Sequence, residues 1–297
     1  MKQPKLPNFI IFGTTKSGST SLCNYIQQHP DVFVSERKEP NYFLYEEGSS
    51  DVNQKGEVTE YTLDWYKYWF RYADQKAIGE ASVSYLADEN APARIKQTVP
   101  NVKLIAILRE PVSRMYSHYL FFQRGKRMPD VGNLLEAFEY DQSQGSPYKL
   151  FEKGLYAQCL KRYFAQFDAE QFKIFLFEDF TSNPEQVTKD VFEFLGVDSD
   201  FEAVTTAKDA SSGIPRNKSV YNFLYKDNPI KKILRPITRT VFPNAEKRRA
   251  VWTRLVSSSL SKPKLSAEIK EALREKYRPD ILELQEMISR DLSKWLE

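Results

Sequence analysis

The 297-residue chain has little cysteine and no long apolar run. Its two cysteines, Cys23 and Cys159, fall on separate predicted helices, so neither a disulfide framework nor a metal site is expected. No stretch approaches the roughly 18 apolar residues that a membrane helix needs, and the four-residue apolar run near the start is too short for a secretory signal. These shortages predict a cytoplasmic protein with reduced thiols and no integral association with a membrane.

What the chain does contain is enough apolar surface to fold. Hydrophobic residues make up 41% of it and aromatic residues 14%, which excludes a wholly disordered chain. Short apolar runs predict strands at 8–12, 76–80, 103–108 and 172–177. Helical spacing predicts helices near 19–28, 90–98, 111–125, 154–167 and 183–195. This alternation favours an α/β fold, a doubly wound parallel sheet with helices on both faces.

The C-terminal part is expected to complete a single domain of 1–297, made of an α/β core over 8–218 and a basic lid with helices over 219–297. In the helical cap, a second helix is predicted to begin at Pro279. Between Pro215 and Arg254, eleven Lys and Arg residues stand against two acidic residues, a net charge of +9 that leaves −6 for the rest. Such a segment suits an anionic donor or acceptor, or is a solvated face. No nucleic-acid motif accompanies it, so nucleic acid is not an expected partner.

A loop rich in glycine and hydroxyl side chains follows the first predicted strand. The apolar run 9–12 leads into Gly13-Thr14-Thr15-Lys16-Ser17-Gly18-Ser19-Thr20-Ser21, and helical spacing begins at Ser19. Free backbone N–H groups and the helix dipole then converge on one point, where phosphate is favoured. The expected anion ligands are Thr15, Lys16, Ser17, Gly18, Ser19, Thr20 and Ser21.

The position of the lysine separates this loop from that of nucleotide triphosphatases. Their G-x-x-x-x-G-K-[ST] motif has the lysine after the second glycine, where this chain has Ser19. Lys16 lies inside the loop and is expected close to a single phosphate and the group that leaves from it. A nucleotide kinase or NTPase of related P-loop-like fold is therefore a disfavoured alternative. A second alternative is a non-catalytic module that binds an anionic polymer through the basic segment.

Four segments in order resemble sulfotransferases that use 3′-phosphoadenosine 5′-phosphosulfate (PAPS), in the branch of heparan-sulfate-type and bacterial enzymes. They are the loop at 13–22, Lys38-Glu39-Pro40-Asn41-Tyr42-Phe43, the segment 104–119, and Gly154-Leu155-Tyr156-Ala157 before the strand 173–177. The resemblance implies PAPS as donor, 3′-phosphoadenosine 5′-phosphate (PAP) as product and no metal. The acceptor would be a hydroxyl or amine of a small molecule or carbohydrate.

The resemblance also implies the donor-binding residues. Arg109 and Ser117 match the pair that holds the 3′-phosphate, and Tyr156 is a candidate for the adenine pocket. Arg216 and Lys218 match a late basic loop that closes over the same phosphate. Arg114 is expected to be a surface or salt-bridge residue.

The base that takes the acceptor's proton is expected to be a glutamate. The chain has only two histidines: His29 suits a cap or surface role, and His118 lies on the 3′-phosphate helix, away from the acceptor. Glu39 stands where heparan-type enzymes have their catalytic glutamate, and Glu80, at the end of the next strand, is the alternative. Those enzymes have a lysine after the second glutamate, whereas this chain has Ala81, which places a sulfated-polysaccharide acceptor in question.

Overall fold

In a computed structural model, the structure describes residues 5–52, 56–205, 213–216 and 259–297. Its centre is a five-stranded sheet in the order β2-β5-β1-β6-β7, and all of its pairs are parallel. The strands are β1 (Phe9–Ile11), β2 (Val32–Val34), β5 (Ala77–Glu80), β6 (Lys103–Leu108) and β7 (Phe172–Leu176). The chain moves from β1 to one side of the sheet and then to the other, so β1 lies at the point where the winding reverses. Ligands of such sheets bind there, beyond the carboxyl ends of the strands.

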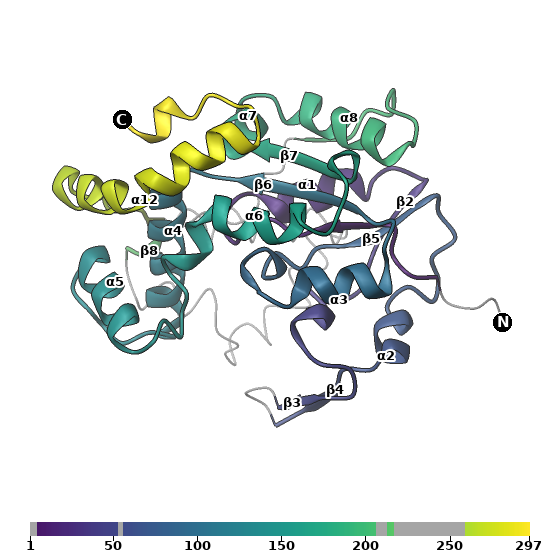
Figure 1. Cartoon of the computed structure of the whole chain (residues 1–297), viewed down its shortest axis with the longest axis horizontal. Coiled ribbons are helices and arrows are strands. Elements are labelled where there is room, and N and C mark those ends of the chain that lie inside the picture. The colour runs from purple at the N-terminus through teal and green to yellow at the C-terminus, as the bar shows by residue number, and fades with distance from the viewer. Residues whose placement is uncertain (1–4, 53–55, 206–212, 217–258) are drawn as a thin grey trace, which may run out of the picture.

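Helices cover both faces of the sheet, as the sequence predicts (Figure 1). Successive side chains of a strand point to opposite faces, so Ile10 and Phe12 belong to one apolar core and Phe9 and Ile11 to the other. The helices of the larger core are α3 (Ala91–Thr98), α4 (Pro111–Gly125), α5 (Leu134–Ser143), α6 (Tyr156–Phe164) and α12 (Ala267–Met287). Those of the smaller core are α1 (Ser19–Ile26), α7 (Phe177–Ser182) and α8 (Pro184–Leu195).

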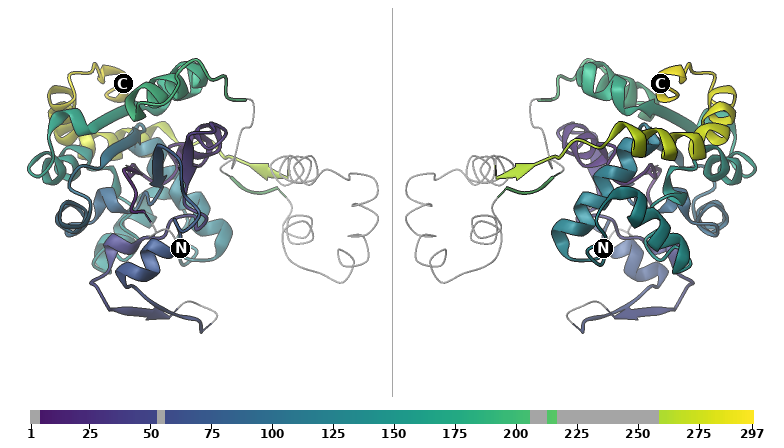
Figure 2. Two further views of the ribbon diagram at one scale, coloured as in Figure 1. Left: turned by 90° about the vertical axis from the view of Figure 1, so that its right-hand side faces the viewer. Right: turned by 90° about the vertical axis from the view of Figure 1, so that its left-hand side faces the viewer.

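Several short elements complete the fold. One helix, α2 (Leu63–Tyr68), packs against the larger core. Two antiparallel pairs join β3 (Ser50–Val52) to β4 (Val58–Glu60) and β8 (Ile214–Pro215) to β9 (Leu260–Ser261). Figure 2 shows β8 and β9 at the periphery of the molecule. The 3-10 turns are η1 (Tyr42–Leu44), η2 (Tyr85–Ala87), η3 (Glu152–Gly154), η4 (Ala169–Gln171) and η5 (Ser293–Trp295).

The C-terminal helix α12 runs unbroken through Pro279, so the expectation that a second helix begins there is wrong. The proline removes one backbone hydrogen bond, which normally kinks or ends a helix. Here the same apolar stripe continues on both sides of it, in the buried residues Leu273, Tyr277, Ile281 and Leu284. In addition, the Asp280 carboxylate accepts hydrogen bonds from the N–H groups of Ala157 and Gln158, each at 3.1 Å. Packing against α6 therefore outweighs the local preference.

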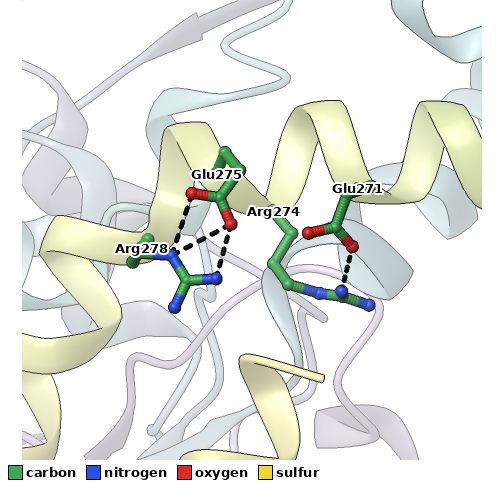
Figure 3. A network of polar contacts seen from close by, with 4 residues as sticks. All are labelled: Glu271, Arg274, Glu275 and Arg278. Atoms are coloured by element: carbon green, nitrogen blue, oxygen red, sulfur yellow. Dashed lines mark hydrogen bonds and ion pairs between the residues drawn. The ribbon is translucent and has the colours of Figure 1, made fainter.

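The turns of α12 that precede the proline carry two ion pairs, each between residues about one helical turn apart (Figure 3). Arg274 binds Glu271, and Arg278 donates from Nε to both carboxylate oxygens of Glu275, at 3.0 and 2.9 Å. Pairs at this spacing lie on one helix face and support it modestly. No helix in the part of the chain that the structure describes is both long and apolar enough to span a membrane.

Candidate functional site

The loop between β1 and α1 has a backbone shape that its glycines make possible. A Cβ on Gly13 would lie 3.0 Å from the backbone nitrogen of Ile107, so the loop can pass this close to β6 only with glycine. Gly18, the N-cap of α1, has φ of +92°, and Lys16 has φ of +73°, in the left-handed region that side chains rarely adopt. A lysine keeps such a strained backbone conformation only where the surrounding structure fixes it. Strain of this kind is frequent at functional sites.

Two hydroxyl groups of this loop have no hydrogen-bond partner among the residues that the structure describes. The hydroxyls of Thr15 and Ser17 are buried and make no hydrogen bond within the described residues. Thr20 accepts a hydrogen bond from Lys38 Nζ at 3.1 Å, and Arg109 Nη1 donates to the carbonyl oxygen of Lys16 at 2.9 Å. Buried hydroxyls are almost always paired, so these two call for a ligand. A strand, this loop and the N-terminus of α1 have the arrangement that suits a bound anion.

Cations surround the loop. Burial, and then the neighbouring charges of Arg124, Arg109, Lys38 and Lys262, lower the pKa of Lys16 to about 8. Like charges held this closely repel one another, and a bound anion removes that cost. The electrostatics therefore favour a ligand with more than one negative charge.

Arg109 and Ser117 occupy the places that the sequence predicts, at the end of β6 and in the second turn of α4. The guanidinium of Arg109 also lies over the Phe177 ring, 4.4 Å from its centroid, and Ser117 is buried. Tyr156 is fully buried, and its hydroxyl donates to the carbonyl oxygen of Arg109 at 2.8 Å. Tyr156 thus lies in the core behind Arg109 and supports the end of β6. The sequence had suggested instead that its side chain could line the adenine pocket.

A cavity of about 340 Å³ adjoins this cation cluster. The first two turns of α4 form one wall, and the segment after β9 forms the other; the lining residues are Val112, Ser113, Tyr116, Lys262, Pro263, Lys264, Leu265 and Lys270. The charge of Lys262 reaches both Arg109 and Lys16. Lys262 therefore links the cavity electrostatically to the loop.

Glu39 lies on the turn that follows β2, with φ of +53°. Burial raises the pKa of its carboxyl, while the charges of Lys38 and Lys153 oppose that rise. A carboxylate whose pKa is raised toward neutrality is suited to accept a proton. Since Lys38 also bonds to Thr20, the turn that carries Glu39 is tied to the first turn of α1.

Glu80 is buried completely, and three hydroxyl groups donate to its carboxylate. The donors are Ser82 at 2.6 Å, Tyr85 at 2.8 Å and Tyr66 at 3.0 Å. Burial raises the pKa of Glu80 to about 7, although these hydrogen bonds favour its charged form. A carboxylate so enclosed is not accessible to a substrate.

Two of these hydroxyls, those of Ser82 and Tyr85, connect Glu80 to the turn of Glu39. Ser82 Oγ accepts from the N–H of Asn41 at 2.9 Å, and the Tyr85 hydroxyl accepts from the N–H of Phe43 at 3.4 Å. Each hydroxyl therefore donates to Glu80 and accepts from the backbone that follows Glu39. The network holds that backbone in place.

A family model described as the sulfotransferase domain matches residues 6–280. This chain belongs to the sulfotransferase family. The crystal structure of a sulfotransferase from Alicyclobacillus acidocaldarius is similar to it, with 28% identity and a TM-score of 0.70, over 99% of this chain and 100% of that one.

Curated relatives of this sulfotransferase-family chain include two animal enzymes. Human carbohydrate sulfotransferase 15 is 29% identical over 65% of this chain and 44% of that protein. Mouse heparan sulfate glucosamine 3-O-sulfotransferase 3A1 is 29% identical over 65% of this chain and 46% of that protein. The chain thus spans less than half the length of these relatives.

Two expectations for this family member concern its late basic loop. Arg216 is exposed at the end of β8, and its N–H donates to the carbonyl oxygen of Ser259 at 2.9 Å. Lys218 lies outside the described residues, as does most of the basic segment 215–254. Their expected role at the 3′-phosphate stays a prediction.

The interior of α4 differs from the sequence expectation. Arg114 is fully buried and donates from Nη2 to the carbonyl oxygen of Leu150, so its assignment as a surface or salt-bridge residue is wrong. The reason is that α4 is covered by the segment before α6 as well as by α12. His118 is also buried, and burial together with the charges of Arg114, Lys153 and Lys16 lowers its pKa well below the ordinary value. It therefore lies within electrostatic reach of Lys16, closer to the centre of the site than its sequence position suggested.

His29 has a structural role. Its Nδ1 accepts from the N–H of Asp31 at 3.0 Å, and its Nε2 lies 3.0 Å from the carbonyl oxygen of Asp198. The ring is buried against Phe192 and Phe201. It is no candidate for the base.

Sequence reasoning missed two cations of the site, Lys153 and Lys262. Neither lies in a segment where the anion-loop pattern would direct attention. For Lys153 there was a weak signal, because it directly precedes the matched segment 154–157. For Lys262 the only signal was the short basic segment Lys262-Pro263-Lys264.

Proposed function

We propose that this chain transfers a sulfuryl group from PAPS to a hydroxyl or amine of an acceptor. The observation that carries the proposal is Lys16, a half-buried cation inside a loop whose Thr15 and Ser17 hydroxyls have no partner within the described residues. The 5′-phosphate would bind this loop, with the sulfuryl group directed toward Glu39. Arg109, Ser117 and Lys262 would hold the 3′-phosphate, because an arginine fork and buried donors suit phosphate oxygens.

In the reaction, the acceptor oxygen attacks sulfur while the bond between sulfur and the bridging oxygen of the 5′-phosphate breaks. The electron pair of that bond stays on the bridging oxygen, so negative charge grows there and PAP leaves. Lys16 stabilises this charge, and such groups typically contribute about a hundredfold to a thousandfold in rate. Glu39 takes the proton of the acceptor. Lys16 and Glu39 are therefore the proposed catalytic residues, and a reaction without a metal stays a prediction.

Glu39, and not Glu80, is the proposed base. The carboxylate of Glu80 is fully buried and accepts hydrogen bonds from three hydroxyl groups. Two of these hydroxyls also bind the backbone that follows Glu39, and the third belongs to a core tyrosine. Glu39 lies on the turn itself, beside Lys38 and the loop. Glu80 then acts as a positioning residue.

A carbohydrate is the proposed class of acceptor. Two relatives are named for carbohydrate and heparan sulfate substrates. The segment before Glu39 supports this, because the Arg37 guanidinium lies over the rings of Trp65 and Trp69, at 5.1 and 5.5 Å from their centroids. Aromatic faces beside a cation suit the apolar face and the acidic groups of an anionic sugar. A screen of carbohydrate, phenol, alcohol and amine acceptors with labelled PAPS tests this assignment.

Donor selectivity tests the placement of the nucleotide. Arg109→Ala is expected to weaken PAPS binding by about 1.5–3 kcal/mol, as a lost charge-assisted hydrogen bond does. The same substitution should weaken the binding of adenosine 5′-phosphosulfate much less, because that nucleotide has no 3′-phosphate. Calorimetry with both nucleotides measures the difference, and Arg127→Ala, an exposed arginine after the end of α4, is the matched control. Equal losses for the two nucleotides would show that Arg109 does not contact the 3′-phosphate.

A further inference from the structure

Lys153 is held beside the anion loop from two directions. It lies in the turn η3, which leads into α6, and its carbonyl oxygen accepts a hydrogen bond from Thr14 Oγ1 at 3.3 Å. On the other side, a Cβ on Gly154 would lie 2.8 Å from the Tyr277 hydroxyl, so the turn packs closely against α12. The backbone of Lys153 is therefore fixed to the loop that would carry the donor.

The charge of Lys153 reaches groups on both the Glu39 turn and α4. Its charge acts on the Glu39 carboxylate, and it acts together with Lys16 on His118. Burial, followed by the charges of Arg114 and Lys149, lowers the pKa of Lys153 to about 8. Lys153 thus lies within electrostatic reach of Glu39, the proposed base, while its backbone is bonded to Thr14 of the loop.

Within the described residues, no carboxylate forms an ion pair with Lys153. The Asp141 carboxylate, whose charge acts on Lys153, accepts instead from the N–H groups of Tyr148 and Leu150, at 2.9 and 2.8 Å. The neighbouring Glu152 carboxylate accepts from the side chains of Gln142 and Ser146, both at 2.7 Å. Lys153 is half-buried, and a half-buried ammonium without a counter-ion loses part of its hydration without compensation. A bound anion would remove that cost.

We propose that Lys153 is a second catalytic cation, whose ammonium contacts the oxygens of the sulfuryl group during its transfer. The inference rests on the proposed function. Lys16 stabilises the bridging oxygen that keeps the electron pair, whereas Lys153 neutralises the three oxygens that travel with sulfur. Lys153 stays protonated throughout, and the acceptor's proton goes to Glu39. The two lysines therefore act on the two sides of the bond that breaks.

The test compares PAPS with PAP, which lacks only the sulfuryl group. Lys153→Met keeps the length of the side chain and removes its charge. We expect this variant to bind PAP within about twofold of the wild type, to bind PAPS about tenfold more weakly, and to lose about a hundredfold or more in kcat. Calorimetry without acceptor gives the two affinities, and retained PAP binding shows that the variant is folded. Lys126→Met, at an exposed lysine after the end of α4 whose charge is not among those that act on Lys153, is the control and should change none of these values.

A pH profile adds a readout that a purely structural role would not change. The cation favours the ionised form of Glu39, so its removal raises the pKa of that carboxyl. The acid limb of kcat/KM should move to higher pH in Lys153→Met and return in Lys153→Arg, which restores the charge. Normal turnover in Lys153→Met, or equal weakening of PAP and PAPS, would overturn the inference. Failure of the wild type to bind PAP would instead refute the proposed function.

Discussion

Lys16→Met is expected to lower kcat by about a hundredfold to a thousandfold while the protein remains folded. The substitution keeps the aliphatic stem but removes the cation that stands in the loop next to the leaving oxygen. The wild type should also lose kcat/KM as pH rises above about 8, because the pKa of Lys16 is lowered to about 8 in the free protein and only its charged form is useful. Steady-state kinetics with saturating acceptor measure both effects.

The control for Lys16→Met is another lysine with left-handed backbone. Lys126, at the C-cap of α4, has φ of +51° and is exposed. Lys126→Met imposes the same change of side chain on similar backbone, away from the loop, and should keep full activity. Sulfuryl transfer at the wild-type rate by folded Lys16→Met would remove Lys16 from the mechanism.

Glu39→Gln is expected to lower kcat by about a hundredfold to ten-thousandfold, with little change in PAP affinity. The amide keeps the shape of the side chain and cannot take a proton. The acid limb of the pH profile should disappear with it. The acceptor must carry a hydroxyl of high pKa, because an acidic phenol can react without a base and hide the loss. Glu36→Gln, an exposed glutamate of the same segment that pairs with Arg71 at 2.8 Å, is the matched control.

Glu80→Gln separates the base from its support. It replaces a carboxylate that accepts from three hydroxyls by a group that can accept at only one atom, so the network to Asn41 and Phe43 must rearrange. We expect a loss of stability of about 1–3 kcal/mol and a smaller loss of kcat than in Glu39→Gln, with the acid limb preserved. A dead Glu80→Gln beside a fully active Glu39→Gln would move the base to Glu80.

The sequence was most informative where one local signal dominates. The apolar residues of β6 are followed by Pro111 at the first position of α4, and Glu110 caps that helix by accepting from the N–H groups of Val112 and Ser113. Strand, cap and proline all agree, so the boundary could be predicted. The anion loop is similar, since glycine spacing and the place of Lys16 lie within nine residues. The edge strand β2 was missed because its apolar run, 32–34, is one residue shorter than the run 9–12 and is not followed by a glycine.

Features that depend on distant contacts were beyond prediction. Nothing local indicates that Tyr66 from α2 and Tyr85 from η2 converge on one carboxylate, which is what distinguishes the role of Glu80 from that of Glu39. Lys153 is 139 residues from the Thr14 hydroxyl that binds its carbonyl group. The continuity of α12 through Pro279 likewise comes from packing that no local pattern shows.

The most direct test of the central claim is transfer of labelled sulfate from PAPS to a panel of carbohydrate acceptors, combined with calorimetry of PAP and ATP. We expect label in at least one acceptor and one PAP formed for each sulfate transferred. We also expect PAP to bind more tightly than ATP, because only PAP has a 3′-phosphate. ATP labelled in its γ-phosphate should label no acceptor. Phosphoryl transfer from ATP, together with no affinity for PAP and no sulfate transfer, would contradict the central claim.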